Sequence, residues 1–529
     1  MGSKKLQVWL PLIFAVVLAV GMYLGYQLKE NTTGPDNFFL NAKSNSLQEI
    51  LDLIKNKYVD NVSADSIEDA GINEMLSHLD PHTVYIPAKE TNEANEDLVG
   101  NFQGIGIEFQ IYNDTVNVVN VIPGGPSDKA GLQVGDKLIK ANDTGKLAGV
   151  HIDVDEIKKY LRGPGGSTVK LNILHNNQFK DITITRGIIP LPALDASYII
   201  SPKTGYIRLN KFSETTYPEF MDALEKLQKQ GMDKLILDLR ENGGGLIQQA
   251  VDIADEFLND DKLVVYTQGA HSAKHDYDCK RPGLFETGKL VVLIDETTAS
   301  ASEILTGALQ DWDRATIIGR RSFGKGLVQE PFYLSDGSEI RLTIARYYTP
   351  VGRNIQKPYD KGKDAYEEEL LNRFHNGEVV TQDTSTQKGT AYKTPGGHTV
   401  YGGGGITPDI FVPFDTTSSP KAEKQLYFKG TINNFTYLYF LQNKTLLSNY
   451  KTTTDFYYNF HPGENEWQQL SNFAQKDTID MSTISGNNKT QVLQRFQMLL
   501  ARQMWRTEGY YEVSNRNDAM IKKALEVLK

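Results

Sequence analysis

The sequence is almost free of cysteine: among its 529 residues, Cys279 is the single one. One thiol excludes an intrachain disulfide, a structural zinc site built on cysteines and an iron–sulfur cluster. Positive charge is also in short supply, because 56 Lys and Arg residues stand against 66 Asp and Glu residues, for a formal net charge of -10. Nucleic acid is therefore not expected as the main partner, since neutralising its phosphates requires a basic face.

Metal-binding patterns are equally scarce. His271 and His275 lie close to Asp276, Asp278 and Cys279, which imitates a metal cluster, but nothing around them predicts a helix that would bring them to one face. No His-Glu-x-x-His motif occurs in the chain. We therefore predict no metal ion and no cofactor.

One long uncharged run is present near the N-terminus. Lys4 and Lys5 precede residues 6–28, which carry no charge, and Lys29 and Glu30 follow. As a helix, this run would reach about 34 Å, enough for a hydrocarbon core of about 30 Å. The flanking lysines predict that the short tail stays in the cytoplasm and that the rest is exported. No Ala-x-Ala cleavage site follows, which favours an uncleaved anchor over a removed signal peptide.

The expected location is therefore a bacterial inner membrane that the chain crosses once. Residues 1–28 would form the cytoplasmic tip and the transmembrane anchor, and the domains that follow would lie on the periplasmic or extracytoplasmic side.

Along the rest of the chain the pattern of apolar residues changes several times. The length of the whole chain predicts roughly three to five structural units. Helical spacing of apolar residues gives way to short strands punctuated by Gly and Pro, and then to strands that alternate with helices. The last pattern indicates an α/β core with a largely parallel sheet. The expected units are a stalk with N-terminal helices (29–95), a mostly β domain (96–187), an α/β core (188–415) with a polar insertion or loop (356–399), and a helical extension (416–529). The extension carries no recognisable chemistry, so a scaffold or partner-binding surface is expected there.

A serine-rich turn is the first candidate for chemistry. It follows a buried strand (290–294), opens a helix and has the sequence Thr298-Ala299-Ser300-Ala301-Ser302-Glu303-Ile304. Free N–H groups and the positive dipole end at a helix N-terminus suit an oxyanion that develops beside a serine. Taken alone, however, the turn is better explained as an ordinary helix cap.

A glycine-rich loop also follows a buried strand and opens a helix. Its sequence is Asp238-Leu239-Arg240-Glu241-Asn242-Gly243-Gly244-Gly245. Glycines let backbone N–H groups approach a ligand closely. Phosphate binding is disfavoured because no Gly-Lys-Ser/Thr follows and the spacing is not G-x-G-x-x-G. An oxyanion-hole loop and a plain tight turn both stay open.

A serine nucleophile needs a base, and two residue types compete for this role. Lys325 lies between glycines beside apolar strands, where desolvation would lower the pKa of its ammonium group. As a lone observation, a lysine between glycines is usually a solvated loop residue. Nine histidines are the alternative, but most of them lie outside the α/β core or in loops.

The mostly β domain has a glycine-spaced loop ahead of a strand, with glycine-rich turns further on. The loop and strand read Gln103-Gly104-Ile105-Gly106-Ile107-Glu108-Phe109. Together these features resemble a PDZ domain, and a plain glycine-rich hairpin is the alternative. The resemblance implies that N–H groups of the loop 104–106 hold a peptide's terminal carboxylate while the peptide adds as a strand. Ile105 and Ile107 would line an apolar pocket.

In their order along the chain, these motifs resemble those of the C-terminal processing (tail-specific) peptidases, a family with N-terminal helices, a PDZ domain and a Ser/Lys protease core. The resemblance spans about residues 46–413. It includes the segments Leu79-Asp80-Pro81-His82-Thr83, Gly324-Lys325-Gly326-Leu327-Val328-Gln329, Tyr348-Thr349-Pro350-Val351-Gly352-Arg353 and Gly403-Gly404-Gly405-Ile406-Thr407-Pro408-Asp409. It implies a crotonase-like α/β core, shared with the ATP-dependent (Clp) serine proteases.

Carried over to this sequence, the resemblance implies that Ser300 is the nucleophile, Lys325 its general base and Gln329 the residue that positions the lysine. Ser302 is the competitor: two helical positions turn a side chain by about 200°, so both serines cannot face the lysine. Periodicity does not choose between them, and the family spacing selects Ser300.

The resemblance also implies an oxyanion hole, formed by the N–H of Ala301 and by a glycine of the pair Gly244 and Gly245. The expected function is that of a membrane-anchored serine endopeptidase which recognises C-terminal tails of exported proteins and forms an acyl-enzyme. Its partners would be polypeptides with free C-termini, the membrane, and a further copy of the chain or a regulatory protein. The alternatives are a non-catalytic PDZ scaffold protein and a crotonase-like acyl-CoA enzyme.

Overall fold

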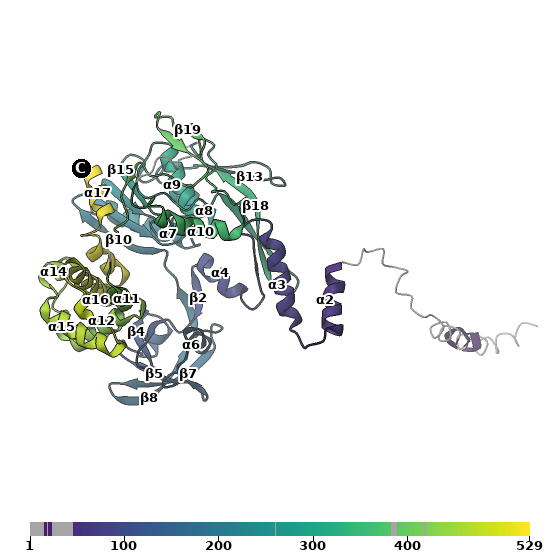
Figure 1. The fold of residues 1–529 in the computed structure, drawn as a ribbon, viewed down its shortest axis with the longest axis horizontal. Coiled ribbons are helices and arrows are strands. Elements are labelled where there is room, and N and C mark those ends of the chain that lie inside the picture. Colours follow the sequence, from purple (N-terminus) through teal and green to yellow (C-terminus); the bar gives the residue numbers. More distant parts are fainter. Residues whose placement is uncertain (1–14, 18–19, 24–45, 260, 382–388, 417–418) are drawn as a thin grey trace, which may run out of the picture. The chain divides into compact units, whose positions relative to one another are not determined.

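A computed structural model describes residues 15–17, 20–23, 46–259, 261–381, 389–416 and 419–529 (Figure 1). The chain divides into two compact units, Met1–Glu74 and Met75–Lys529. The first contains helix α2 (Ser46–Lys57) and most of α3 (Ala64–Ser77). The second contains the remaining elements described below, and the domain limits within it stay predictions.

The expected membrane anchor requires a correction. Crossing about 30 Å of hydrocarbon takes about 20 helical residues, and no helix in the described part of the chain is both long and apolar enough. Of the run 6–28, only the helical pieces 15–17 and 20–23 are described, and the rest lies outside the described residues. The prediction of a single-pass inner-membrane protein is therefore contradicted and is withdrawn.

The mostly β domain is an antiparallel sheet in the order β3-β4-β5-β7-β8, with β6 paired to β5. Strand β3 is the edge of this sheet, and β2 pairs with β9 separately. The element bounds are β1 (Val84–Ile86), α4 (Thr91–Val99), β2 (Asn101–Gly104), β3 (Ile107–Ile111), β4 (Val116–Val121), α5 (Pro126–Lys129), β5 (Lys137–Ala141), β6 (Gly145–Lys146), α6 (Val154–Leu161), β7 (Thr168–His175), β8 (Gln178–Thr185) and β9 (Gly187–Pro190). Helix α6 begins where Asp153 accepts the N–H of Glu156, and it buries Ile157 and Leu161 in the core of the domain.

The α/β core is built on the sheet β10-β11-β12-β15-β16-β21, in which neighbours from β11 to β21 are parallel and β10 is antiparallel. The bounds are β10 (Leu194–Ser201), β11 (Thr204–Leu209), α7 (Thr216–Lys229), β12 (Lys234–Asp238), α8 (Ile247–Asp255), β15 (Lys289–Ile294), α9 (Ala301–Asp311), β16 (Thr316–Gly319) and β21 (Ile410–Phe411). Its strands are apolar at successive positions because both faces of the sheet are covered.

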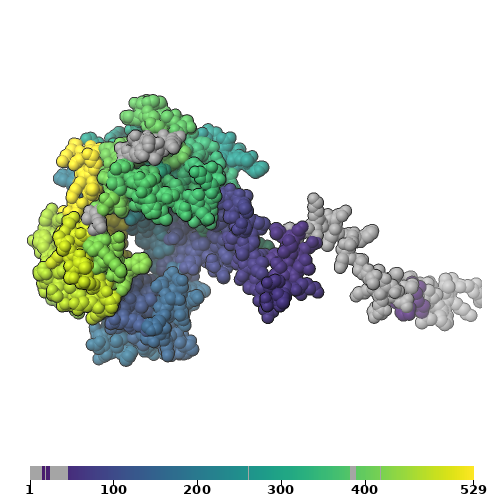
Figure 2. Space-filling model, in the orientation of Figure 1, coloured from purple at the N-terminus to yellow at the C-terminus, as the bar shows by residue number. Residues whose placement is uncertain are grey.

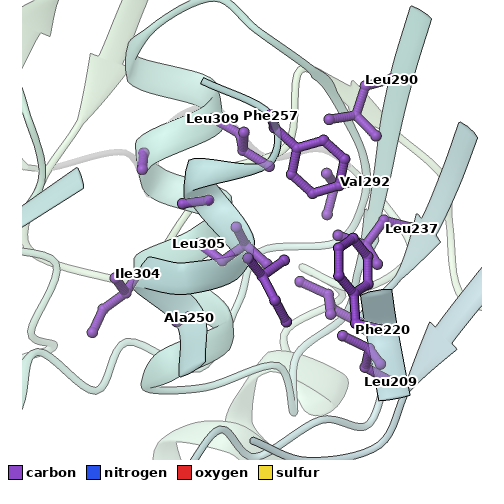
Figure 3. Packing of buried hydrophobic residues seen from close by; sticks show 14 of the residues in the cluster. Leu209, Phe220, Leu237, Ala250, Phe257, Leu290, Val292, Ile304, Leu305 and Leu309 are labelled. Atoms are coloured by element: carbon purple, nitrogen blue, oxygen red, sulfur yellow. The ribbon is translucent and has the colours of Figure 1, made fainter. Parts of the chain in front are cut away.

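Alternate side chains of these strands enter two different clusters. Leu237 and Val292 face helices α7, α8 and α9. They share one cluster with Phe220 of α7 and Leu305 of α9, and Figure 3 shows all four side chains. Ile236, Val291 and Leu293 face the opposite way, towards helix α17 (Ala519–Val527) at the C-terminus. The last helix of the extension therefore packs against the α/β core.

An antiparallel sheet, β1-β18-β13-β14 with β17 paired to β18, lies within the same unit. The bounds are β13 (Leu263–Gln268), β14 (His275–Asp278), β17 (Leu327–Tyr333) and β18 (Glu339–Tyr348). Pairing of β1 with β18 brings the segment Asp80–Thr83, far away in sequence, to the beginning of β17, where Gln329 binds it.

The polar segment 356–399, expected as an insertion or loop, contains regular structure. Its elements are α10 (Lys363–His375), β19 (Ala391–Lys393) and β20 (Thr399–Tyr401). Helix α10 lacks an apolar stripe because its buried side chains are those of Tyr366 and Arg373, and Arg373 donates to the carbonyl oxygens of Ser322 and Phe323.

The C-terminal extension is helical, as expected, and has its own aromatic core, which includes Phe435, Phe456, Trp467 and Phe496. The bounds are α11 (Lys421–Phe428), α12 (Thr431–Gln442), α13 (Lys444–Leu447), α14 (Thr453–Asn459), α15 (Glu464–Ala474), η2 (Gln475–Asp477), η3 (Met481–Thr483) and α16 (Gly486–Ser514), followed by α17.

This extension, lime to yellow in Figure 2, contacts both neighbouring domains. Tyr437 donates its hydroxyl to the carbonyl of Val118 in β4, and helix α16 packs against β10.

Candidate active site

One pocket of about 410 Å³ brings together residues from distant parts of the chain. Its polar wall comes from the start of α9, from the glycine-rich loop after β12 and from the start of β17. Apolar and charged side chains share the rest of the lining, which includes Asn95, Leu98, Gly243, Gly244, Gly245, Leu246, Ile247, Ser300, Ile304, Lys325, Leu327, Val328, Gln329, Glu330, Glu339 and Arg341. The predicted nucleophile, base, positioning residue and glycines therefore share one cavity.

The two candidate serines differ in their surroundings. Ser300 lines the pocket, with φ 55° and ψ −118° immediately before helix α9. Few non-glycine residues adopt such a conformation, and those that do are concentrated at functional sites. Ser302 is fully buried, and its hydroxyl donates a 3.0 Å hydrogen bond to the carbonyl of Asn242. The structure thus separates the two residues that periodicity left equivalent.

Lys325 is held by Gln329. The lysine Nζ donates to Gln329 Oε1 over 2.9 Å, and the Gln329 amide in turn donates to the carbonyl of His82. Burial lowers the pKa of Lys325, and it outweighs the negative charges of Asp80 and Glu303, which act in the opposite direction. Within the described residues, no hydrogen bond joins Ser300 Oγ to Lys325 Nζ.

Glu303 ties the serine and lysine segments together. Its buried carboxylate accepts hydrogen bonds from the N–H groups of Ser300, Gly324 and Lys325, at 2.9, 2.7 and 2.9 Å, and also from the Ser322 hydroxyl. Burial nevertheless raises the pKa of Glu303. No role for Glu303 is predicted from the sequence, although the spacing Ser300-x-x-Glu303 is that of a capping box.

The segment Asp80–Thr83 is a second contributor without an assigned role. Asp80 accepts the N–H groups of His82 and Thr83 over 2.8 and 2.9 Å, and the Thr83 hydroxyl over 2.6 Å. These bonds fix the His82 carbonyl that orients Gln329. Burial, assisted by the nearby Lys325, lowers the pKa of His82 to about 4. A neutral imidazole therefore lies beside the lysine, hydrogen-bonded over 2.7 Å to the hydroxyl of Tyr366.

The predicted oxyanion donors are not equivalent. The N–H of Gly244 donates to the side-chain oxygen of Asn242 over 2.9 Å. The N–H groups of Gly245 and Ala301 have no partner among the hydrogen bonds of the described residues. Gly244 instead provides a close approach: a Cβ at this position would lie 2.7 Å from Ser300 Cβ and 2.8 Å from the Ala301 nitrogen.

The predicted peptide-binding loop lies between β2 and β3. Gly104, Ile105 and Gly106 are buried, and the Ile105 carbonyl accepts the Ser127 N–H over 3.0 Å. Ile105 belongs to the core of the domain, whereas Ile107 is only partly buried at the start of the edge strand.

Comparisons with known proteins decide the family. Residues 203–362 match the model of Peptidase family S41, and residues 103–185 match that of the PDZ domain. A carboxy-terminal-processing protease of Bartonella bacilliformis is 38% identical over 314 residues, which cover 58% of this chain and 71% of that protein. A carboxyl-terminal-processing protease of Synechocystis is 34% identical over 378 residues, or 68% of this chain and 87% of that protein. The chain belongs to the carboxy-terminal-processing proteases.

The protein is therefore a serine-type peptidase with a PDZ domain, as the sequence motifs predicted. This result favours the peptidase over the scaffold protein and the acyl-CoA enzyme that stayed open. The solved structure of the Photosystem II D1 C-terminal processing protease is similar to 70% of this chain and 86% of its own, with 26% identity and a TM-score of 0.36. Residues 423–506, which form most of the helical extension of this peptidase, match a Family of unknown function (DUF8443).

Proposed function

We propose that this carboxy-terminal-processing protease uses a Ser/Lys dyad, with Ser300 as nucleophile and Lys325 as general base. The observation that carries the proposal is the shared pocket, which both Ser300 and Lys325 line. A lysine serves as a base only when it is uncharged, and burial lowers the pKa of Lys325 towards that state.

In the proposed reaction, uncharged Lys325 accepts the Ser300 proton while Oγ bonds to the carbonyl carbon of the scissile peptide. The tetrahedral intermediate collapses, the C–N bond breaks, and the lysine returns the proton to the leaving amine. An ester of Ser300 with the N-terminal part of the substrate is left. Water then gives a proton to the same lysine and attacks the ester carbon. The bond between this carbon and Ser300 Oγ breaks, the lysine returns the proton to Oγ, and the second product leaves. Catalytic hydrogen bonds often shorten only once substrate is bound, so Ser300 and Lys325 need not be bonded beforehand.

The proposed oxyanion hole consists of the N–H groups of Gly245 and Ala301. Ala301 directly follows Ser300 and Gly245 lines the same pocket as Ser300, and neither N–H is engaged by another group in the described residues. Two donors that are already oriented stabilise the developing negative charge without reorganisation. Gly244 is better suited to closing the loop against Ser300, since Asn242 already accepts its N–H.

We further propose that the PDZ domain binds the free C-termini of polypeptide substrates. The edge position of β3 supports this, because an unpaired strand edge accepts an added peptide strand. The loop of Gly104, Ile105 and Gly106 immediately before β3 would hold the terminal carboxylate, with Ile107 beside the peptide's apolar end.

Steady-state cleavage of an unfolded polypeptide with an apolar C-terminus tests the dyad. Ser300→Ala and Lys325→Ala should each reduce kcat by at least about 10⁴-fold, and the double variant should be scarcely worse, because residues that act as one unit are not additive. Lys325→Arg should not restore activity, since a guanidinium does not accept the serine proton. Ser302→Ala is the matched control and should retain most activity. Near wild-type turnover of Lys325→Ala would refute a lysine base and return attention to His82.

A further inference from the structure

The glycine-rich loop is held from outside the peptidase domain. Arg240, three residues before the glycines, donates from Nε and Nη2 to the carboxylate of Asp238 and from Nη1 to Asp518 over 2.7 Å. Asp518 belongs to the C-terminal extension. The Arg240 side chain is 14% exposed and that of Asp518 is 25% exposed, so this ion pair is largely shielded from solvent. Charge-assisted bonds in such surroundings are stronger than those at an open surface.

Asp518 is itself rigidly placed. It is the N-cap of α17 and accepts the N–H groups of Met520 and Ile521 over 2.8 and 3.0 Å. Met520, Ile521 and Ala524 are buried in one cluster with Ile236 and Val291 of the core sheet. The helix therefore anchors one carboxylate beside the loop, and burial of its apolar face anchors the helix.

The loop residues that follow Arg240 contact the segment 295–300, which ends at Ser300. The N–H of Glu241 donates to Asp295, the carbonyl of Asn242 accepts the N–H of Ala299, and Gly244 touches Ser300. Glu241 adopts φ 61°, a conformation in which a non-glycine residue needs external support. Arg240 therefore joins Asp518 to a loop whose next residues contact the segment that carries Ser300.

We propose that Asp518 is a positioning residue for peptide hydrolysis, and that the helical extension acts through it to hold the glycine-rich loop against Ser300. The proposal rests on the catalytic role of this loop and of Ser300 given above. It assigns a task to the end of the extension, which lies beyond the residues 423–506 that match the family of unknown function: helix α17 completes the active site without touching the substrate.

Asp518→Asn and Asp518→Ser test this, because both replacements retain a helix N-cap while removing the charge that binds Arg240. We expect kcat for a peptide substrate to fall about tenfold in Asp518→Asn and further in Asp518→Ser, since misplacing a catalytic group is costly even at small displacements. The KM and the thermal midpoint should stay close to those of the wild type. The affinity for a peptide aldehyde, which forms a tetrahedral adduct on the serine, should fall by the same factor as kcat. Glu526→Gln, an exposed acid-to-amide change on the same helix, is the matched control and should change none of these values.

Two outcomes would overturn the proposal. Wild-type kcat and aldehyde affinity in both Asp518 variants would show that the loop does not need this anchor. A loss of activity explained by a smaller folded fraction, with unchanged kcat per titrated active site, would show a purely structural role. Ser300→Ala, measured in parallel, separates this proposal from the proposed function. An active Ser300→Ala variant refutes the dyad. An inactive Ser300→Ala variant, together with wild-type activity of both Asp518 variants, refutes only the positioning role.

Discussion

Replacing Gly244 by alanine should disable the enzyme by a route that the structure specifies. The residue has φ +93°, and an added Cβ would lie 2.6 Å from the Ala299 carbonyl oxygen, 2.7 Å from Ser300 Cβ and 2.8 Å from the Ala301 nitrogen. Two of these are backbone atoms, which have little freedom to move aside. The backbone conformation alone costs a non-glycine residue about 1–3 kcal/mol, and overpacking a rigid site adds about 1–3 kcal/mol.

The loop can relieve this overlap only by moving away from Ser300. A misplacement of about 1 Å at a catalytic centre lowers the rate about 100-fold, so Gly244→Ala should lose at least that much kcat in whatever fraction folds. Gly243→Ala is the matched comparison, since nothing lies within 4 Å of a Cβ there. Its free energy of unfolding should stay within about 1 kcal/mol of the wild type.

Urea unfolding and steady-state cleavage by both variants, with active-site titration, provide the measurement. Equal stability of Gly243→Ala and Gly244→Ala, together with wild-type kcat for Gly244→Ala, would refute the close packing of this loop on Ser300.

Two further predictions concern charge. Since the neutral lysine is the active form, kcat/KM should rise with pH through the lowered pKa of Lys325. The variant Asp80→Asn should move this acidic limb to lower pH, because the negative charge of Asp80 raises the lysine pKa. The pH profiles of the two enzymes measure the shift, and a shift to higher pH would contradict the prediction. Amidating the C-terminus of a substrate peptide should weaken binding to the PDZ domain, since charge-assisted hydrogen bonds to the carboxylate are worth about 1.5–3 kcal/mol. Calorimetric titration with amidated and free peptides tests this, and equal affinities would remove the reason for assigning that role to the loop 104–106.

Local patterns predicted the elements well where burial follows the period of the element. The buried strand expected at 290–294 is β15, which has one residue more. Helix α10 was not predicted from the sequence, because its buried positions carry Tyr366 and Arg373 and the helix therefore has no apolar stripe. Burial of a cation becomes possible only when distant carbonyl groups and Glu369 are present to bind it.

The expected membrane anchor failed for a different reason. Its evidence was composition alone, the absence of charge over residues 6–28 with lysines ahead of it. An uncharged run is a necessary condition for a transmembrane helix, but it does not establish one.

The sequence by itself determined the candidate residues of the active site and the family to which the chain belongs. Motif spacing brought Ser300, Lys325, Gln329 and the glycines into consideration, because turn and helix-start chemistry is local and leaves a local signature. Only the tertiary structure decided how these groups meet. It buries Ser302 and exposes Ser300 to the pocket, engages the Gly244 N–H, and brings Asp80 and Asp518 from the two ends of the chain to the lysine and to the glycine-rich loop. Contacts across more than two hundred residues depend on strand pairing and on the packing of α17, and no short-range pattern encodes them.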